Sequence, residues 1–153
     1  MITMYTDGAS RGNPGRGGYG TVLMYGQHRK ELSAGYRNTT NNRMELLAVI
    51  VGLEAIKKPG MEVKVYSDSQ YVVDAVNKGW VWTWQRKNFK GKKNPDLWQR
   101  FISVYQRHDV KMQWIKGHSG IPENERCDEL AVASADGPDL LVDEGYEQSI
   151  QNI

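Results

Sequence analysis

The order of strand-like and helix-like segments restricts the fold of this 153-residue chain more than any other feature of the sequence. Strands are predicted by alternating or β-branched apolar residues, and helices by apolar residues that recur every three or four positions. The predicted strands span residues 1–6, 21–25, 31–36, 63–66 and 110–115, and the predicted helices span residues 42–58, 70–77, 96–107 and 122–135. Because three strands come first and the others alternate with helices, we expect an α/β layered domain that begins with an antiparallel meander.

A glycine-rich segment, residues 8–20, separates the first two predicted strands. Its Gly15, Gly17 and Gly20 match the spacing of dinucleotide-binding glycines, G-x-G-x-x-G. That fingerprint has to open a helix, whereas residues 21–25 have the pattern of a strand, so the sequence does not support a nucleotide-binding enzyme. We interpret these glycines instead as positions where the backbone can approach a nucleic acid closely.

Charge is unevenly distributed along the chain, although the net charge is only +2. Ten Lys and Arg but only two acids lie between Lys78 and Lys116, whereas nine acids and a single base, Arg126, lie from Pro122 to the end. The basic middle segment is typical of contact with a polyanion, and it is equally compatible with a solvated surface. Residues 136–153 show no strong pattern, so we expect them to form a loosely ordered acidic tail.

The single cysteine, Cys127, cannot form a disulfide within the chain, so we expect a reducing compartment such as the cytoplasm. The longest nearly unbroken apolar run, from Leu46 to Leu53, is far shorter than a membrane span. One cysteine and three histidines also argue against a zinc site.

Four acids, Asp7, Glu45, Asp68 and Asp128, are candidates for a shared site, although each also has a structural explanation. Asp7 before a glycine is typical of a hairpin turn, and Glu45 could complete a helix cap that begins at Asn42. Asp68 precedes a predicted helix and could cap it, while Asp128 would complement the dipole near a helix start. Taken singly, none of the four is decisive.

The positions of the four acids favour a shared site. Asp7 ends one predicted strand and Asp68 follows another, so parallel neighbouring strands would bring both side chains to the same edge of the sheet. Glu45 and Asp128 belong to the first halves of two helices that can reach this edge. Carboxylates gathered in this way repel one another, and hard divalent cations such as Mg²⁺ or Mn²⁺ would relieve the repulsion.

Six short segments carry a family resemblance. In chain order they are Tyr5-Thr6-Asp7-Gly8, Gly12-Asn13-Pro14-Gly15, Thr40-Asn41-Asn42-Arg43-Met44-Glu45, Tyr66-Ser67-Asp68-Ser69-Gln70, Lys116-Gly117-His118 and Asn124-Glu125-Arg126-Cys127-Asp128. They closely resemble the bacterial type 1 ribonucleases H and follow one another in the order of that family. The resemblance covers residues 1–135, which we expect to be the catalytic domain.

This resemblance implies a ribonuclease H-like fold, in which three antiparallel and then two parallel strands form a five-stranded mixed sheet flanked by helices. It implies a monomeric endonuclease that hydrolyses the RNA strand of RNA/DNA hybrids to 5′-phosphate and 3′-hydroxyl ends, with a role in removing RNA primers or R-loops. Two Mg²⁺ ions, replaceable by Mn²⁺, would be held by all four carboxylates. His118 matches a family histidine that assists proton transfer near the leaving group.

The resemblance also implies which residues contact the substrate. They are Thr40, which would lie near a DNA phosphate, and the amide-bearing residues Asn13, Asn41, Asn42 and Gln70. Their amides can sense the 2′-hydroxyl across a wide minor groove, although such residues are also common in turns and caps.

Residues 79–93 resemble the basic protrusion of the family in a shortened form. Lysines there would contact DNA phosphates, and an exposed tryptophan would lie against a sugar or base. These substrate contacts are Trp80, Lys90, Lys92 and Lys93. The alternative, that the tryptophans pack between helices, fits Trp84 and Trp82 better.

Two other functions share this fold. A non-catalytic hybrid-binding module would not need all four carboxylates, and all four are present in this sequence. Strand-transfer enzymes with similar acidic sites usually carry further DNA-binding domains, for which 153 residues leave no room. Both alternatives predict that RNA in a hybrid stays uncut.

Overall fold

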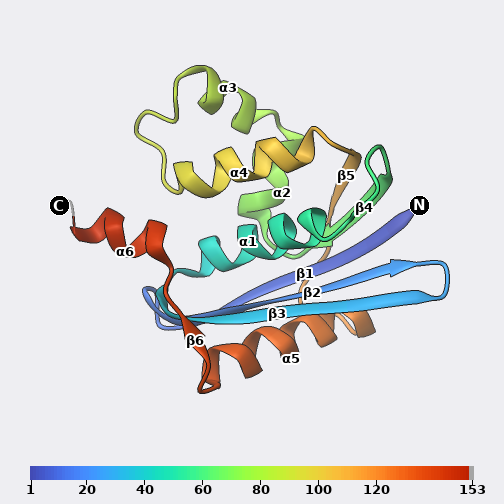
Figure 1. Cartoon of the computed structure of the whole chain (residues 1–153), viewed down its shortest axis with the longest axis horizontal. Helices are drawn as coiled ribbons and strands as arrows, with labels where there is room; N and C mark the ends of the chain where they lie inside the picture. The colour runs from blue at the N-terminus through green and yellow to red at the C-terminus, as the bar shows by residue number, and fades with distance from the viewer. Residues whose placement is uncertain (152–153) are drawn as a thin grey trace.

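The centre of the molecule is a mixed sheet with the strand order β5-β4-β1-β2-β3-β6 (Figure 1). The computed structural model describes residues 1–151 of the chain. The strands are β1 (Ile2–Arg11), β2 (Gly15–Tyr25), β3 (His28–Thr39), β4 (Glu62–Ser67), β5 (Asp109–Trp114) and β6 (Leu140–Leu141). The first three strands pair antiparallel, β4 pairs parallel with β1, and β5 pairs parallel with β4. This confirms the predicted five-stranded sheet, to which β6 adds a short parallel strand beside β3.

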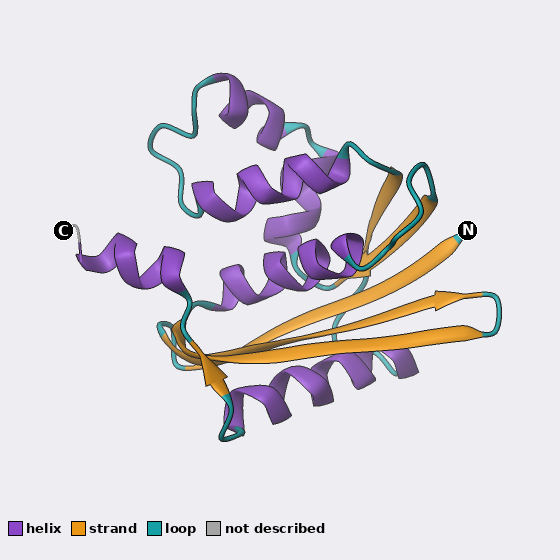
Figure 2. Cartoon of the chain, in the orientation of Figure 1, coloured by secondary structure: helices purple, strands orange, loops and turns teal. Residues whose placement is uncertain are grey.

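Helices cover both faces of this sheet (Figure 2). They are α1 (Asn41–Glu54), α2 (Gln70–Asn77), α3 (Trp80–Arg86), α4 (Pro95–Tyr105), α5 (Pro122–Asp136) and α6 (Glu144–Gln151). The first four lie on one side of the sheet and α5 lies on the other, so the sheet is the middle of three layers. Within residues 1–151, no helix combines the length and the apolar character needed to cross a membrane.

The glycine-rich segment is mostly strand, because β1 runs on to Arg11 and β2 begins at Gly15. Two of its glycines, Gly18 and Gly20, serve the packing of α5. A Cβ added to Gly20 would lie 2.2 Å from the carbonyl oxygen of Cys127, and one added to Gly18 would lie 2.4 Å from that of Ala131. The interpretation that these glycines admit a nucleic acid is therefore wrong for Gly20, since α5 occupies that space.

The segment predicted as a basic protrusion contains α3, which the sequence analysis did not predict as a helix. Its Trp84 packs edge-on against Trp98 with ring centroids 5.8 Å apart, and Trp82 packs against Tyr105 at 5.3 Å. These contacts confirm helix packing as the role of both residues. Phe89, which is 5% exposed, anchors the loop after α3 in the core.

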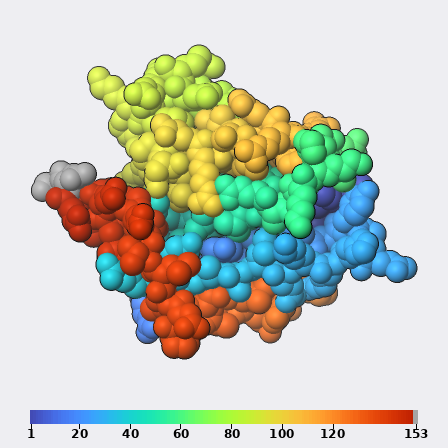
Figure 3. Space-filling model, viewed as in Figure 1, coloured from blue at the N-terminus to red at the C-terminus, as the bar shows by residue number. Residues whose placement is uncertain are grey.

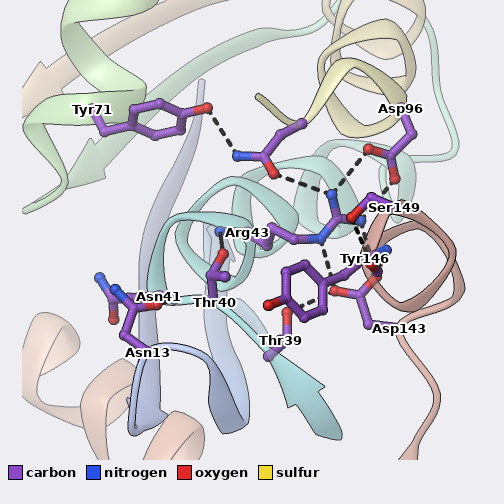
Figure 4. A network of polar contacts seen from close by, with 11 residues as sticks. Asn13, Thr39, Thr40, Asn41, Arg43, Tyr71, Asp96, Asp143, Tyr146 and Ser149 are labelled. Atoms are coloured by element: carbon purple, nitrogen blue, oxygen red, sulfur yellow. Dashed lines mark hydrogen bonds and ion pairs between the residues drawn. The ribbon is translucent and has the colours of Figure 1, made fainter. Parts of the chain in front are cut away.

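The acidic tail forms β6 and α6 rather than the loosely ordered segment that we predicted, and it lies against one end of the molecule (Figure 3). The buried carboxylate of Asp143 accepts hydrogen bonds from Arg43 at 2.8 and 2.9 Å and from Thr39 at 2.6 Å (Figure 4). In α6, Glu147 accepts two bonds from Arg37 at 2.7 and 2.9 Å. Polar contacts hold α6, and none of its residues is buried, so no core-facing apolar residues mark this helix in the sequence. Residues 152–153 lie outside the described part of the chain.

Candidate active site

Strand pairing brings Asp7 and Asp68 to one place. The parallel register of β1 and β4 ends at the pair Thr6 and Ser67, so the two aspartates come directly after it on neighbouring strands. Asp7 does not end its own strand as predicted, because β1 continues along β2 as far as Arg11. The hairpin turn lies beyond Arg11, so a turn role for Asp7 is wrong.

Glu45 reaches the same place from the second turn of α1. The N-cap of this helix is Thr40, whose hydroxyl accepts a hydrogen bond from the backbone N–H of Arg43 at 3.3 Å. A cap beginning at Asn42 is therefore not what holds Glu45. Instead its carboxylate accepts a hydrogen bond from the backbone N–H of Gly8. A Cβ on Gly8 would lie 2.5 Å from the Glu45 nitrogen, so this glycine lets α1 sit directly on β1.

Asp68 does not cap α2, which was the structural alternative for this residue. Ser69 caps α2, and its hydroxyl accepts a hydrogen bond from the Val72 N–H at 3.2 Å. The Asp68 side chain instead lies against the loop after β5, where a Cβ on Gly117 would be 2.6 Å from its Oδ2. Its carboxylate therefore remains available to the site.

Asp7, Glu45 and Asp68 form a compact carboxylate cluster, each offering an oxygen within 4.8 Å of the others. Asp7 and Glu45 are buried, at 5% and 3% exposed. Two carboxylates ~5 Å apart repel by ~3 kcal/mol at an effective dielectric near ~20. Oε2 of Glu45 is buried without a hydrogen-bond partner among residues 1–151. A buried, unsatisfied anionic oxygen among like charges fits a site for a hard cation.

The pKa values reflect this crowding. Burial, together with the charges of Asp68 and Asp128, raises the pKa of Asp7 to about 7, although hydrogen bonds with Glu45 and Gly8 oppose the rise. Burial and the neighbouring Asp7 charge raise the pKa of Glu45 well above its ordinary value. Without a cation, the cluster therefore holds protons that ordinary carboxylates would have lost, and cation binding would release them.

Asp128 approaches the cluster from α5 and lines the same hollow, where it is half-buried. Within the described chain it is not one of the three acids that come within 4.8 Å of one another. The structure therefore places Asp128 beside the cluster rather than in it, and its role as a fourth metal-binding carboxylate stays a prediction.

Three of the nine predicted substrate contacts and the predicted proton carrier line the same hollow. Its lining includes Asn41, Asn42, Gln70 and His118. Asn13 joins this group indirectly, because its Oδ1 accepts a hydrogen bond from the backbone N–H of Asn41 at 3.1 Å. His118 is exposed in the loop after β5, with a backbone φ of +55°.

Two lining residues were missed by the sequence analysis, namely Ser69 and Tyr71. Both flank Gln70 at the start of α2, and this placement is the signal that could have found them. The Tyr71 hydroxyl accepts hydrogen bonds from Asn94 at 3.1 Å and from Trp98 at 2.9 Å, which tie the hollow to the start of α4.

Comparison with known proteins identifies the family. The sequence profile of the RNase H family matches residues 1–136. This chain belongs to the ribonuclease H family. A ribonuclease H of Desulforamulus reducens is 58% identical over 147 residues, covering 93% of this chain and 92% of that protein. A ribonuclease HI of Synechocystis sp. is 50% identical over 151 residues, covering 95% and 94%.

Solved structures of ribonucleases H share the fold. LC9-RNase H1, described as a type 1 RNase H with the type 2 active-site motif, superposes with a TM-score of 0.81 and 33% identity, covering 97% of this chain and 79% of that one. LC11-RNase H1, solved in complex with an RNA/DNA hybrid, has a TM-score of 0.67 and 29% identity, covering 89% and 97%.

Of the other residues that the ribonuclease H resemblance assigns to the substrate, Thr40 caps α1 without lining the hollow. Trp80, Lys90, Lys92 and Lys93 lie outside the hollow. Trp80 is 44% exposed, and the Lys78 ammonium lies 5.2 Å from its ring centroid. The Lys92 ammonium lies 5.3 Å from the Trp84 ring. These residues form a separate exposed cationic surface on and after α3, and their contact with DNA stays a prediction.

Proposed function

We propose that this chain is an endonuclease that hydrolyses the RNA strand of RNA/DNA hybrids. One observation carries the proposal: a member of the ribonuclease H family gathers Asp7, Glu45 and Asp68 within 4.8 Å, with one buried oxygen of Glu45 left without a hydrogen-bond partner in the described part of the chain. Such a cluster costs stability in a purely structural protein, because like charges repel and desolvated charges need partners.

The carboxylates would hold divalent cations, two Mg²⁺ in the substrate complex, with Mn²⁺ as a substitute. Asp7, Glu45 and Asp68 supply oxygens from three different elements, and Asp128 supplies a fourth carboxylate from α5. Bound Mg²⁺ supplies Lewis acidity toward a phosphate oxygen and lowers the pKa of bound water. The protein supplies the fixed positions, since the Gly8 N–H orients Glu45 and strand pairing orients the two aspartates.

His118 would move a proton near the leaving 3′-oxygen, consistent with 5′-phosphate and 3′-hydroxyl products. It lines the hollow from an exposed loop that is anchored by Gly117 against Asp68. An exposed imidazole on a loop can exchange its proton with solvent between turnovers. We therefore assign His118 an assisting role rather than an essential one.

The amides around the hollow would read the hybrid. Asn41, Asn42 and Gln70 line the hollow beside the carboxylates, where a ribose 2′-hydroxyl could exchange hydrogen bonds with them. Asn13 would act beside Asn41, and Thr40 would lie near a DNA phosphate while also capping α1. The exposed surface around Trp80 and the lysines after α3 would hold the DNA strand.

In the cell, this activity would remove RNA primers and R-loops during replication and repair. A monomer in the cytoplasm is the form we expect. The chemistry proposed for the site depends neither on this cellular role nor on the oligomeric state or location.

The test is a cleavage assay on a hybrid with end-labelled RNA, run beside duplex RNA, duplex DNA and single-stranded RNA. With Mg²⁺ or Mn²⁺, RNA of the hybrid should be cut internally to products with 5′-phosphates, and the other substrates should stay intact. Chelation should stop the reaction and added Mg²⁺ should restore it. Folded protein that leaves the hybrid uncut with both metals would instead indicate a binding module.

A further inference from the structure

The three clustered carboxylates are held in place in different ways. The backbone N–H of Gly8 donates to Oδ1 of Asp7 at 2.9 Å, and it also donates to the carboxylate of Glu45. Within residues 1–151, the Asp68 carboxylate accepts no comparable hydrogen bond, and the bond that this residue does accept goes to its backbone carbonyl. The position of the third carboxylate must therefore be set through the backbone that carries it.

The backbone of Asp68 lies in the short link between β4 and α2. Ser69 is the N-cap of α2, and its carbonyl accepts the first bond of the helix, from the N–H of Val73 at 3.1 Å. The carbonyl of Asp68 comes one residue earlier, so the helix does not use it. It accepts its hydrogen bond from the indole N–H of Trp114 instead, at 3.1 Å.

Trp114, the last residue of β5, has no role in the hydrophobic core of the described chain. Its side chain is 40% exposed, and it is not among the residues packed against the core cluster. The indole ring has a single polar atom, which can only donate. The bond to Asp68 is therefore the contact that accounts for a large apolar side chain at this exposed position.

The end of β5 surrounds Asp68 with further contacts. The N–H of Ile115 donates to the carbonyl of Ser67 at 2.9 Å, which continues the pairing of β5 with β4. A Cβ on Gly117 would lie 2.6 Å from Oδ2 of Asp68, so the loop after β5 lies directly against this carboxylate. The bond from Trp114 is made by a side chain, so a substitution can remove it and leave these backbone contacts in place.

We propose that Trp114 is a positioning residue for the metal site. Its indole N–H fixes the backbone of Asp68 and thereby sets the distance from the Asp68 carboxylate to those of Asp7 and Glu45. The proposal rests on the proposed function, because carboxylates need a fixed spacing only if they share a cation. Groups that orient a metal ligand without touching the metal typically contribute roughly 10- to 100-fold in metal affinity or activity.

The test is Trp114→Phe, which keeps an aromatic ring at the end of β5 and removes the N–H. Mn²⁺ binding without substrate, measured from the electron paramagnetic resonance signal of the free ion, should weaken about tenfold. In hybrid cleavage, the Mg²⁺ concentration that gives half the maximal rate should rise by a similar factor, while KM for the hybrid changes less than about twofold. Saturating Mg²⁺ should restore turnover to within about threefold of the parent protein, because all the carboxylates are still present.

The matched control is Trp82→Phe, which changes a tryptophan that packs against Tyr105 away from the carboxylates. It should lower the urea midpoint of unfolding at least as much as Trp114→Phe does, and it should leave Mn²⁺ affinity unchanged. Unchanged Mn²⁺ affinity in Trp114→Phe overturns the proposal. A loss of affinity that Trp82→Phe reproduces also overturns it, because that loss would follow from lower stability alone.

The Mn²⁺ measurement separates this proposal from the proposed function. Parent protein that binds Mn²⁺ but leaves the hybrid uncut would refute the nuclease activity, and the comparison of Trp114→Phe with Trp82→Phe would still support or overturn the role of Trp114. Parent protein that binds neither Mn²⁺ nor Mg²⁺ would overturn both.

Discussion

Two buried charges lie two residues apart in α1, and their surroundings are opposite. Arg43 is 3% exposed, and its five N–H donors are all matched by acceptors on Asp143, Asp96 and Asn94. Glu45 is equally buried, but one of its oxygens has no hydrogen-bond partner within residues 1–151, and its charged neighbours in the cluster are carboxylates. The first charge is saturated by the protein, and the second requires something that the protein does not supply.

The two environments follow from helix geometry. Residues two positions apart do not face the same side of a helix, so Arg43 points to α4 and the tail while Glu45 points to β1 and β4. Saturated buried charges hold elements together, whereas unsaturated ones shift pKa values and mark functional sites. One helix therefore contributes a structural tie on one side and a cation site on the other.

The largest expected effect is on cleavage, when a carboxylate of the Asp7, Glu45 and Asp68 cluster is removed. Asp7→Asn removes a cation-binding carboxylate, and since a metal supplies several kcal/mol of transition-state stabilisation, cleavage should fall at least about 10³-fold. Hybrid affinity should change little. Cleavage assays and titration of labelled hybrid measure the two effects, and retained activity at physiological Mg²⁺ would mean that the metal site is misassigned.

Removing Arg43, whose charge is fully paired, should instead reduce stability. Arg43→Ala leaves Asp143 buried and unpaired, so the free energy of unfolding should fall by about 3–5 kcal/mol. Denaturant unfolding measures this loss. As a control, the same truncation at the exposed Arg37 should cost much less, because solvent screens its surface pair with Glu147. A loss at Arg43 no larger than at Arg37 would contradict the distinction.

The two sides should also respond to pH with opposite signs. The pKa of Asp7 is raised to about 7, so the folded metal-free protein keeps a proton that the unfolded chain loses near pH ~4. The free energy of unfolding should therefore fall as pH rises from ~4 to ~7, by at most about 4 kcal/mol. Burial raises the pKa of Asp96, whereas the hydrogen bonds and positive charge of Arg43 lower it. The lowering outweighs the rise, so the pKa of Asp96 lies below its ordinary value. Its contribution is therefore present above pH ~4 and is lost as pH falls through the folded value.

Urea unfolding in a chelating buffer at several pH values checks this prediction. Asp7→Asn should flatten the decline between pH ~4 and ~7, whereas Asp96→Asn should reduce only the acid-side loss. Superimposable profiles for Asp7→Asn and the parent protein would show that the cluster carries no raised pKa.

A smaller effect is expected at the edge of the unsaturated site. His118→Ala should slow turnover by about 10–100-fold at saturating metal, because a positioned proton carrier is lost while the carboxylates remain. Hybrid affinity should stay nearly intact. Single-turnover cleavage measures the rate, and an unchanged rate removes His118 from the mechanism.

The smallest effect is expected from removing the solvent-exposed lysines after α3. Replacing Lys90, Lys92 and Lys93 together by alanine should weaken hybrid binding and reduce its salt dependence by about one unit of slope for each phosphate that a lysine no longer neutralises. Stability should not change, since these side chains are exposed. Affinity measured at several salt concentrations tests this, and an unchanged slope would place the DNA-binding surface elsewhere.

Much of the fold could be predicted from local patterns. Periodicity predicted α2 at its observed bounds, and the order of segments predicted the mixed sheet and the meeting of Asp7 with Asp68. Local patterns failed where distant contacts dominate. Position 20 must be glycine because the backbone of Cys127 in α5, more than a hundred residues away, leaves no space for a side chain. Helix α6 is held by polar contacts, such as that between Arg37 and Glu147, which local apolar patterns do not predict.

The sequence by itself determined which residues carry charge, the order of the main strands and helices, and which family the motifs resemble. Only the tertiary structure decided what each charge meets, because a carboxylate in the sequence has the same chemistry whether it caps a helix or joins a cluster. Thr40 and Ser69 take the capping roles, which leaves Glu45 and Asp68 for the site, while Asp143 in the tail neutralises Arg43. Burial and neighbouring charge, which chain order does not encode locally, separate these roles.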